Sequence, residues 1–516
     1  MSWVTISEIC RLKIRKVEEG VDFGGLPIME QPSSAGDAKI PAANVGINAP
    51  HDDAPHDDAP HDDAPHDDAL TEAGYQTGGP ADPAAEPEGD SAAGLWALFL
   101  GLGLLMIGNG LNGAVIGVRS GNEGFSVVVT GVIMAGYFAG FLIAPSLVVK
   151  MIASVGHIRV FAGLASLASS AVLIHALSVV PVTWTAMRFV FGFCFAGLYI
   201  VIESWLAELS TPKNRGRTLA VYMIVGMAGL GIGQYLIAVA DPNGFHLFIV
   251  SSVLVSLALV PVTLAAAARV PPSRPVEKVS IRELIGYVPT GVVGSFMSGA
   301  SAGVLLSLAA VYATRSGLSV DRTAAFLIAP TIGAIALQWP IGRLSDRVSR
   351  RAVIFGVVIA AAALSVTAST VRPDSALMLL VMFGIGGTMF PLYSLVVSYT
   401  LDWTPVEKTV GAAGTLVRIN GSGALVGPLV AAPLMSWFGD DAFFFTMSAW
   451  FSVILAFVAY RIAFKDALPS ERQTKFVPFP ARASNVAIRL VVLPVKATKV
   501  VSRAAVSRRH KHPDPN

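Results

Sequence analysis

Long apolar runs separated by short polar links fill most of the chain. An α-helix rises 1.5 Å per residue, so about 20 apolar residues cross a hydrocarbon layer of about 30 Å. Twelve runs of this length fall near residues 95–117, 125–149, 158–178, 182–206, 217–239, 245–267, 289–313, 323–341, 352–370, 376–400, 411–435 and 442–463. The pattern predicts an all-α membrane protein with twelve transmembrane helices.

Composition agrees with this interpretation. Hydrophobic residues make up 53% of the 516 residues, and charged residues only 14%. This hydrophobic fraction is larger than the core of a soluble protein needs. The two cysteines, Cys10 in a polar region and Cys194 inside an apolar run, are not expected to form a disulfide. No motif for nucleotide hydrolysis is present, and we expect no enzyme activity, no cofactor and no resident metal.

The regions outside the apolar runs carry opposite charges. Residues 1–93 have an excess of 14 acidic residues and contain the repeat Pro-His-Asp-Asp-Ala, so they predict a disordered acidic region. Its four histidines could bind a metal weakly, but a disordered spacer has no fixed geometry for one. Residues 465–516 have an excess of 8 basic residues. From Arg482 they predict either an amphipathic helix on anionic inner-leaflet lipid or a disordered basic arm touching the acidic region.

The charges in the loops predict the orientation. With the N-terminus in the cytoplasm, about 14 Lys and Arg residues lie in inward loops and about 4 in outward loops. Both termini are therefore predicted to be cytoplasmic, in a bacterial-type inner membrane. A proline-rich, charged loop at 269–288 divides the helices into two groups of six, 94–268 and 289–464.

The two groups look like repeats at an offset of about 193 residues. Phe191-Gly192 matches Phe383-Gly384, and Thr211-Pro212 matches Thr404-Pro405. Gly229 and Gly233 likewise match Gly423 and Gly427. A parallel repeat of six helices is typical of transporters that bind their solute between two halves.

One charged loop carries a recognisable motif. The stretch Gly342-Arg343-Leu344-Ser345-Asp346-Arg347-Val348-Ser349-Arg350-Arg351 resembles the signature loop of the major facilitator superfamily of secondary transporters. The runs Phe195–Tyr199 and Glu203–Leu206, followed by Arg215-Gly216-Arg217, are similar to the YcaD-like branch. The resemblance covers about 370 residues and implies two pseudo-symmetric six-helix bundles.

The resemblance also implies a conformational switch. Asp346, within a set that includes Gly342, Arg347 and Arg351, would cap the start of the fifth helix near Gly216-Arg217 in the outward-facing state, since a carboxylate is favoured at a helix N-terminus. Alternatively, Asp346 only pairs with Arg347 or Arg351. Two departures from the family pattern stand out. The first-half loop has no aspartate, and the fifth helix lacks the Gly-Pro of antiporters, which disfavours drug/proton antiport.

Three charged residues lie inside predicted spans, where ionisable groups are costly enough to indicate function. Arg188 needs an anionic partner, either a solute or a protein acceptor; alternatively it bonds backbone carbonyls or water near the outer edge. Glu203, about 22 Å further along the same helix, cannot pair with Arg188. Glu203 and Arg418 are candidates for an inner-gate ion pair, with Glu203 the candidate for proton coupling; alternatively the pair is only structural.

Helices one, four, seven and ten line the pore in this superfamily, which nominates further cavity residues. They are Asn109, Asn112, Tyr199, Ser295, Ser298 and Tyr393. Each of them could instead bond a neighbouring helix.

The resulting hypothesis is a secondary active transporter of a small polar or anionic solute, coupled to protons and working by alternating access. Its partners would be the solute and the bilayer, with no nucleic acid, and we expect a monomer. The alternatives are a transporter-like ligand sensor that signals through its tails, and a drug/proton efflux antiporter. Solute flux against a gradient would separate transporter from sensor.

Overall fold

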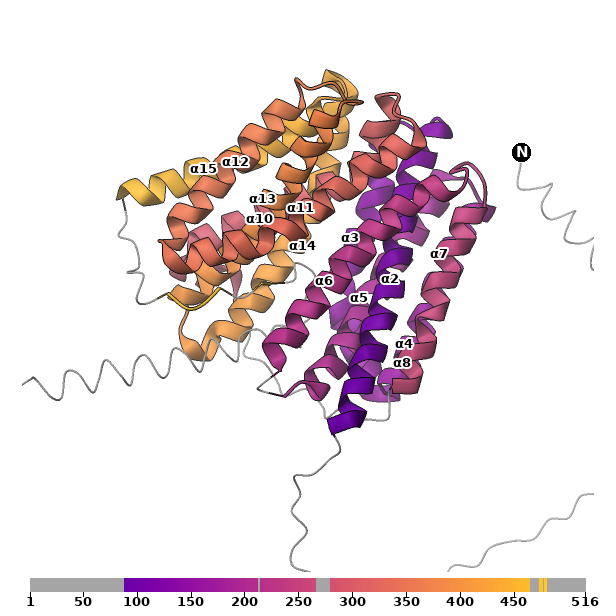
Figure 1. Cartoon of the computed structure of the whole chain (residues 1–516), viewed down its shortest axis with the longest axis horizontal. Coiled ribbons are helices and arrows are strands. Elements are labelled where there is room, and N and C mark those ends of the chain that lie inside the picture. Colours follow the sequence, from indigo (N-terminus) through magenta and orange to yellow (C-terminus); the bar gives the residue numbers. More distant parts are fainter. Residues whose placement is uncertain (1–87, 212–213, 266–278, 465–472, 477, 480–516) are drawn as a thin grey trace, which may run out of the picture. The chain divides into compact units, whose positions relative to one another are not determined.

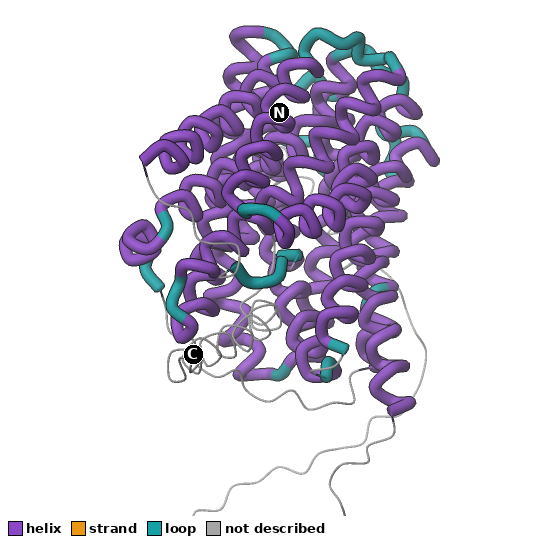
Figure 2. The backbone as a smooth tube through the Cα atoms, turned by 60° about the vertical axis from the view of Figure 1, so that its left-hand side comes forward, coloured by secondary structure: helices purple, strands orange, loops and turns teal. Residues whose placement is uncertain are grey.

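The computed structural model describes residues 88–211, 214–265, 279–464, 473–476 and 478–479. Every regular element among them is a helix, drawn in purple in Figure 2. The acidic region with its repeats, most of the central loop and the tail from Arg482 lie outside the described residues, so the predictions made for them stay predictions.

The twelve predicted spans are confirmed in the described part of the chain. Those of the first half are α2 (Glu88–Asn122), α3 (Val127–Val155), α4 (His157–Leu177), α5 (Pro181–Leu209), α6 (Arg215–Tyr235) with the 3-10 turn η1 (Leu236–Val239), and α7 (His246–Leu257) with α8 (Leu259–Ala265). After the short α9 (Ile281–Tyr287), the second half comprises α10 (Pro289–Arg315), α11 (Val320–Arg347), α12 (Arg350–Ala368), α13 (Ala376–Trp403), the turn η2 (Val406–Lys408), α14 (Thr409–Phe438) and α15 (Ala442–Phe464). In Figure 1 the first half is coloured indigo to magenta and the second half pinkish red through orange to yellow.

The outer faces of the helices expose apolar side chains. Leu177, Leu264 and Phe438 are each at least three-quarters exposed, although they are large and hydrophobic. Such a surface is unfavourable in water and is the surface that lipid requires.

Glycines let the helices approach closely, and they do so in the same way in both halves. A Cβ on Gly233 of α6 would lie 2.0 Å from the carbonyl oxygen of Ile107 of α2. A Cβ on Gly427 of α14 would lie 2.2 Å from that of Ala300 of α10. Ile107 and Ala300 differ by 193 positions, and the two glycines by 194. The repeat predicted from the sequence is therefore a repeat of backbone packing.

The two halves contact each other at one end of the bundle. We call the end that holds Gly342–Arg351 the signature end, and the other the opposite end. At the opposite end, a Cβ on Gly117 of α2 would lie 2.7 Å from Ala310 Cβ of α10. Likewise, a Cβ on Gly131 of α3 would lie 2.5 Å from Ala432 Cβ of α14. The halves are therefore packed together at the opposite end.

The connections at the signature end differ between the halves. Only Gly156, at φ 88°, separates α3 from α4, a conformation that residues with a Cβ rarely adopt. A one-residue link leaves no loop to carry an acidic cap. In the second half, Val348 and Ser349 separate α11 from α12, and Asp346 lies in the last turn of α11.

Candidate functional site

A cavity of about 220 Å³ lies between the two halves. On α6 and α14 its lining residues fall within 222–230 and 417–424, in the parts of these helices nearer the signature end. The walls are mostly apolar, with Met106, Phe138 and Leu306 among them. Polar groups come from Tyr199, Tyr222, Gln338, Ser394 and Arg418.

A second cavity of about 40 Å³ lies beside the first and shares Phe138, Leu230 and Leu306 with it. Its lining is more polar and includes Asn109, Tyr137, Arg188, Gln234 and Ser307. Gln234 accepts a hydrogen bond from Thr331 across the two halves, at 3.3 Å. The small cavity therefore lies between the large cavity and the opposite end of the bundle, where the two halves are packed together.

Arg188 of α5 is held in the wall of the small cavity. Its Nη1 donates to Asn112 Oδ1 of α2 at 2.9 Å, and the guanidinium lies 5.0 Å from the centre of the Tyr137 ring. The residue is only 5% exposed. An amide oxygen and a ring face orient an arginine, which keeps its positive charge and has five N–H donors. A guanidinium oriented in this way beside a cavity can bind an anion there.

Two further polar atoms lie in or next to this site. Asn112 Nδ2 and Ser307 Oγ are buried, and neither has a hydrogen-bond partner among the described residues. Buried polar atoms in native proteins normally have a partner, so such atoms beside a cavity indicate a place for a ligand or water.

Glu203 and Arg418 occupy different positions around the large cavity. Glu203 is fully buried and accepts a hydrogen bond from the Tyr222 hydroxyl at 2.6 Å, and Tyr222 lines the cavity. Arg418 is exposed within the lining, with its Nη2 3.4 Å from Thr415 Oγ1. An inner-gate pair between them stays a prediction for the state in which the signature end closes.

The other predicted cavity residues lie in three different surroundings. Tyr199 lines the large cavity, with its hydroxyl 2.7 Å from Met106 Sδ. Ser295 and Ser298 face α14 instead, where Asn420 Nδ2 donates to Ser295 O at 3.0 Å and to Ser298 Oγ at 3.3 Å. Tyr393 is buried with its ring 6.4 Å from Phe479, and its hydroxyl has no partner among the described residues.

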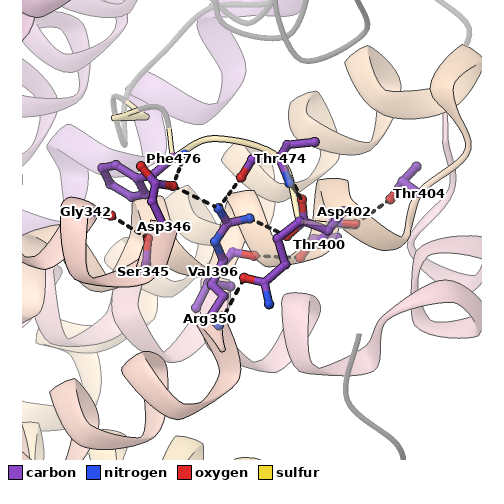
Figure 3. A network of polar contacts seen from close by, with 11 residues as sticks. Gly342, Ser345, Asp346, Arg350, Val396, Thr400, Asp402, Thr404, Thr474 and Phe476 are labelled. Atoms are coloured by element: carbon purple, nitrogen blue, oxygen red, sulfur yellow. Dashed lines mark hydrogen bonds and ion pairs between the residues drawn. The ribbon is translucent and has the colours of Figure 1, made fainter. Parts of the chain in front are cut away.

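The signature loop forms a polar network with α13 (Figure 3). Arg350, 1% exposed, forms an ion pair with Asp402, and its Nη2 lies 3.8 Å from Asp346 Oδ1. The partner of Asp346 within the loop is thus Arg350, neither of the two arginines expected. Arg351 donates to the carbonyl of Arg461 on α15 at 3.1 Å. Arg347 is exposed, as is Arg217 at the start of α6.

Comparison with known proteins agrees with this architecture. The family model described as Major Facilitator Superfamily matches residues 98–329 and 291–506, which is most of the chain. The chain belongs to the major facilitator superfamily. It is a multi-pass membrane transporter, consistent with the two halves and the cavity between them.

Curated relatives of this superfamily member include transporters named YcaD. The chain is 26% identical over 358 residues to the uncharacterised MFS-type transporter YcaD of Escherichia fergusonii. It is 27% identical over 359 residues to YcaD of Escherichia coli. Both matches cover 68% of this chain and 91% of the relative. Among solved structures, the nucleoside transporter NupG has a TM-score of 0.58 at 12% identity, covering 73% of this chain and 100% of its own. At that identity the likeness shows the fold alone.

Several residues of this superfamily member's site were missed by sequence reasoning. Asp402 lies two residues beyond the predicted run 376–400, where an acidic residue is typical of an ordinary loop charge. The available clue was that Asp402 and the arginines of Gly342–Arg351 both lie in predicted cytoplasmic connections, because a buried arginine requires an acceptor. Phe479, which lines the large cavity, had no sequence signal, since it lies in the tail.

Proposed function

We propose that this superfamily member carries a small organic anion with an apolar body across the membrane by alternating access. The observation that supports this proposal most strongly is that a polar cavity lies beside an apolar one. The anionic group would bind at Arg188 in the small polar cavity, and the apolar body would fill the large apolar one. Ligand sites commonly combine an apolar lining with a few placed polar groups.

The charges of the lining favour an anion over a cation. Arg188 borders the small cavity and Arg418 the large one, and an arginine side chain is positively charged. A lipophilic cation would fit the apolar walls, but it would be repelled by both arginines. For the alternative of drug/proton efflux, the apolar walls support an apolar drug, and the two arginines disfavour a cationic one.

The state of the protein is proposed to be inward-facing. The halves are packed at the opposite end, and the cavity lies towards the signature end. The excess of basic residues in the loops at the signature end assigns that end to the cytoplasm. Solute would thus enter or leave from the cytoplasm in this state.

Proton coupling is proposed to act through Glu203. Its carboxylate is buried one residue behind the cavity wall and accepts a hydrogen bond from Tyr222 on α6. Protonation would remove the charge that Arg418 can attract when the signature end closes. Protonation of Glu203 would therefore change the equilibrium between the states with the signature end open and closed.

The test is thermal stabilisation of the purified protein by a panel of organic anions, sugars, amino acids and lipophilic cations. A ligand at 100 times its Kd stabilises the folded state by about 2.7 kcal/mol, so it should be detected before any flux assay exists. We expect an organic anion to stabilise the wild type and to have no effect on Arg188→Ala. Arg119→Ala is the matched control, because it removes a buried arginine of α2 that lines neither described cavity.

Either of two results would contradict the proposal. Stabilisation only by cations or neutral compounds would remove the role of Arg188 in binding. Equal loss of stabilisation in Arg188→Ala and Arg119→Ala would show a general effect of losing an arginine. The identified anion would then be tested for uptake against a gradient in proteoliposomes, because binding without flux would favour the ligand sensor.

A further inference from the structure

A short segment beyond the last transmembrane helix, described at residues 473–476 and 478–479, lies against the signature end of the second half. The helix α15 ends at Phe464, and the segment lies against α11, α12 and α13. Residues about 70 to 130 positions earlier in the chain hold it, at three separate points. The three points are Thr474, Phe476 and Phe479.

Thr474 is the first point, and three hydrogen bonds join it to Asp402 and Arg350 (Figure 3). Its N–H and its hydroxyl both donate to Asp402 Oδ1, at 3.0 and 2.7 Å. Its carbonyl accepts from Arg350 Nη2 at 2.6 Å. Next to it, Gln473 Oε1 accepts from the backbone N–H of Arg350 at 3.2 Å. The buried ion pair of Arg350 and Asp402 is thus completed by the segment.

Phe476 is the second point and occupies the signature motif itself. Its N–H donates to Asp346 Oδ1 at 2.6 Å. Its ring covers Gly342 so closely that a Cβ there would lie 2.4 Å from the ring. The absence of a side chain at Gly342 therefore makes room for the aromatic ring.

Phe479 is the third point and forms part of the wall of the large cavity. It is 2% exposed, its N–H donates to Ser394 Oγ at 3.0 Å, and Ser394 Oγ lies 3.2 Å from its carbonyl oxygen. Gln338 Nε2 of α11 also donates to Ser394 Oγ, at 3.2 Å. Phe479 thus fills space between α11 and α13 that would otherwise belong to the cavity.

The start of α6, across the cavity, is a second candidate partner for the carboxylate of Asp346. The helix α6 starts at Arg215 with no side-chain cap and no acidic residue in its first turn. Uncapped N–H groups at a helix start favour a carboxylate. Asp346 lies on α11, which contacts α6 where Thr331 meets Gly231, on the far side of the cavity from the signature end. Closing that end would bring Asp346 towards α6, but Phe476 holds its Oδ1.

We propose that this segment, residues 473–476 and 478–479, is an autoinhibitory strap that holds the signature end open. When the strap is docked, the N–H of Phe476 binds Asp346, and Phe479 forms part of the cavity wall. The two halves therefore cannot close over the solute. Release of the strap frees Asp346 for the start of α6 and vacates the space beside Ser394. The inference rests on the alternating-access part of the proposed function, and it needs neither the solute nor the proton.

The test measures the opening of the signature end by double electron–electron resonance. Spin labels go on Ala220→Cys of α6 and Leu344→Cys of α11, two exposed positions on either side of the cavity. The background carries Cys10→Ser and Cys194→Ser, and the protein is in nanodiscs without solute. We expect one long distance to dominate in the wild type. In Phe476→Ala/Phe479→Ala, a shorter distance should rise several-fold in population.

Matched controls separate the strap from general damage to the tail. Lys475→Ala changes an exposed side chain of the same segment and should leave the distances unchanged. Thr474→Val removes only the hydroxyl donor to Asp402 and should shift the population in the same direction by a smaller amount. A synthetic peptide of the sequence QTKFVPF should restore the long distance in the double variant.

Two outcomes would overturn the strap. The first is an unchanged distance distribution in the double variant whose thermal midpoint shows that it is folded. The second is an equal change in Lys475→Ala. Since no solute is present, either outcome leaves the anion proposal standing, whereas failure of the anion panel leaves the strap standing.

Discussion

At the scale of single residues, the structure holds its two most informative buried arginines in different ways. Arg350 has a carboxylate partner in Asp402, with backbone and side-chain acceptors from the strap around it. Arg188 contacts an amide oxygen and aromatic faces, and it borders a cavity. A buried charge is tolerated when it is paired with an opposite charge, so the ion pair with Asp402 makes Arg350 a structural residue. Arg188 is the buried arginine for which we propose a role in anion binding.

A third charged contact ties α9 to the start of α14 outside the membrane spans. Lys408 donates to Glu283, and this hydrogen bond lowers the pKa of Glu283 below its ordinary value of 4.5. The same bond raises the pKa of Lys408 above its ordinary value of 10.5. Stability from a lowered carboxyl pKa is present above the unfolded pKa and is lost as pH falls through the folded one. Stability from the raised lysine pKa is lost only as pH rises through its folded value.

We therefore expect Glu283→Gln to lower the thermal midpoint slightly at pH 7, and the difference to disappear as the pH falls through the lowered pKa that Glu283 has in the folded protein. The effect is small because the pair is partly exposed, and it should shrink at high salt. Midpoints of wild type and Glu283→Gln measured from acid to neutral pH provide the check. A difference that persisted in acid would show that the glutamine acts through something other than charge.

At the scale of elements, helix packing depends on glycines at corresponding places in the two halves. Gly233 and Gly427 each bring their helix against a carbonyl of the first helix of their own half. Small residues allow such close approach in membrane proteins, where van der Waals contact replaces the hydrophobic effect as the attraction between helices. A larger side chain at either position would push the pair apart.

We expect Gly233→Val and Gly427→Val to destabilise the fold by at least about 1–3 kcal/mol each, the usual cost of overpacking. Gly163→Val on α4 is the matched control, because nothing lies within 4 Å of a Cβ there. The readout is the thermal midpoint by tryptophan fluorescence, with monodispersity in detergent. A drop of the same size in Gly163→Val would point to β-branching in a helix as the cause.

At the scale of the whole molecule, the described part of the transporter is asymmetric between its two ends. The halves meet at the opposite end, while the cavity and the docked strap lie towards the signature end. The loop charges predict that the signature end is cytoplasmic. In this proposed orientation the strap would be accessible to cytoplasmic factors.

The orientation predicts a labelling pattern in intact cells. In the background without Cys10 and Cys194, Asn243→Cys at the exposed opposite end should react with a membrane-impermeant thiol reagent added outside. Val348→Cys, exposed at the signature end, should react only after the membrane is permeabilised. The reverse pattern would place the signature end outside and would contradict the inward-facing assignment.

Much of the fold could be predicted because its signals are local. The run from Leu95 to Gly117 is apolar enough to require lipid whatever surrounds it, so each span is visible in one dimension. The glycine and proline positions repeat at one offset, which made the two halves visible as well. Arg188 was found by the same reasoning, since a charge inside an apolar run stands out without knowledge of its neighbours.

The sequence by itself thus determined the twelve helices, the two halves and the presence of one charge, Arg188, deep inside a span. Only the tertiary structure decided which polar residues line the cavities, and it put Ser295 and Ser298 against α14 instead. It also decided the partners of Asp346, since Phe476 lies 130 residues further along the chain. The physical reason is that burial in lipid depends on a residue and its near neighbours, whereas a hydrogen bond depends on which distant segment folding brings within about 3 Å.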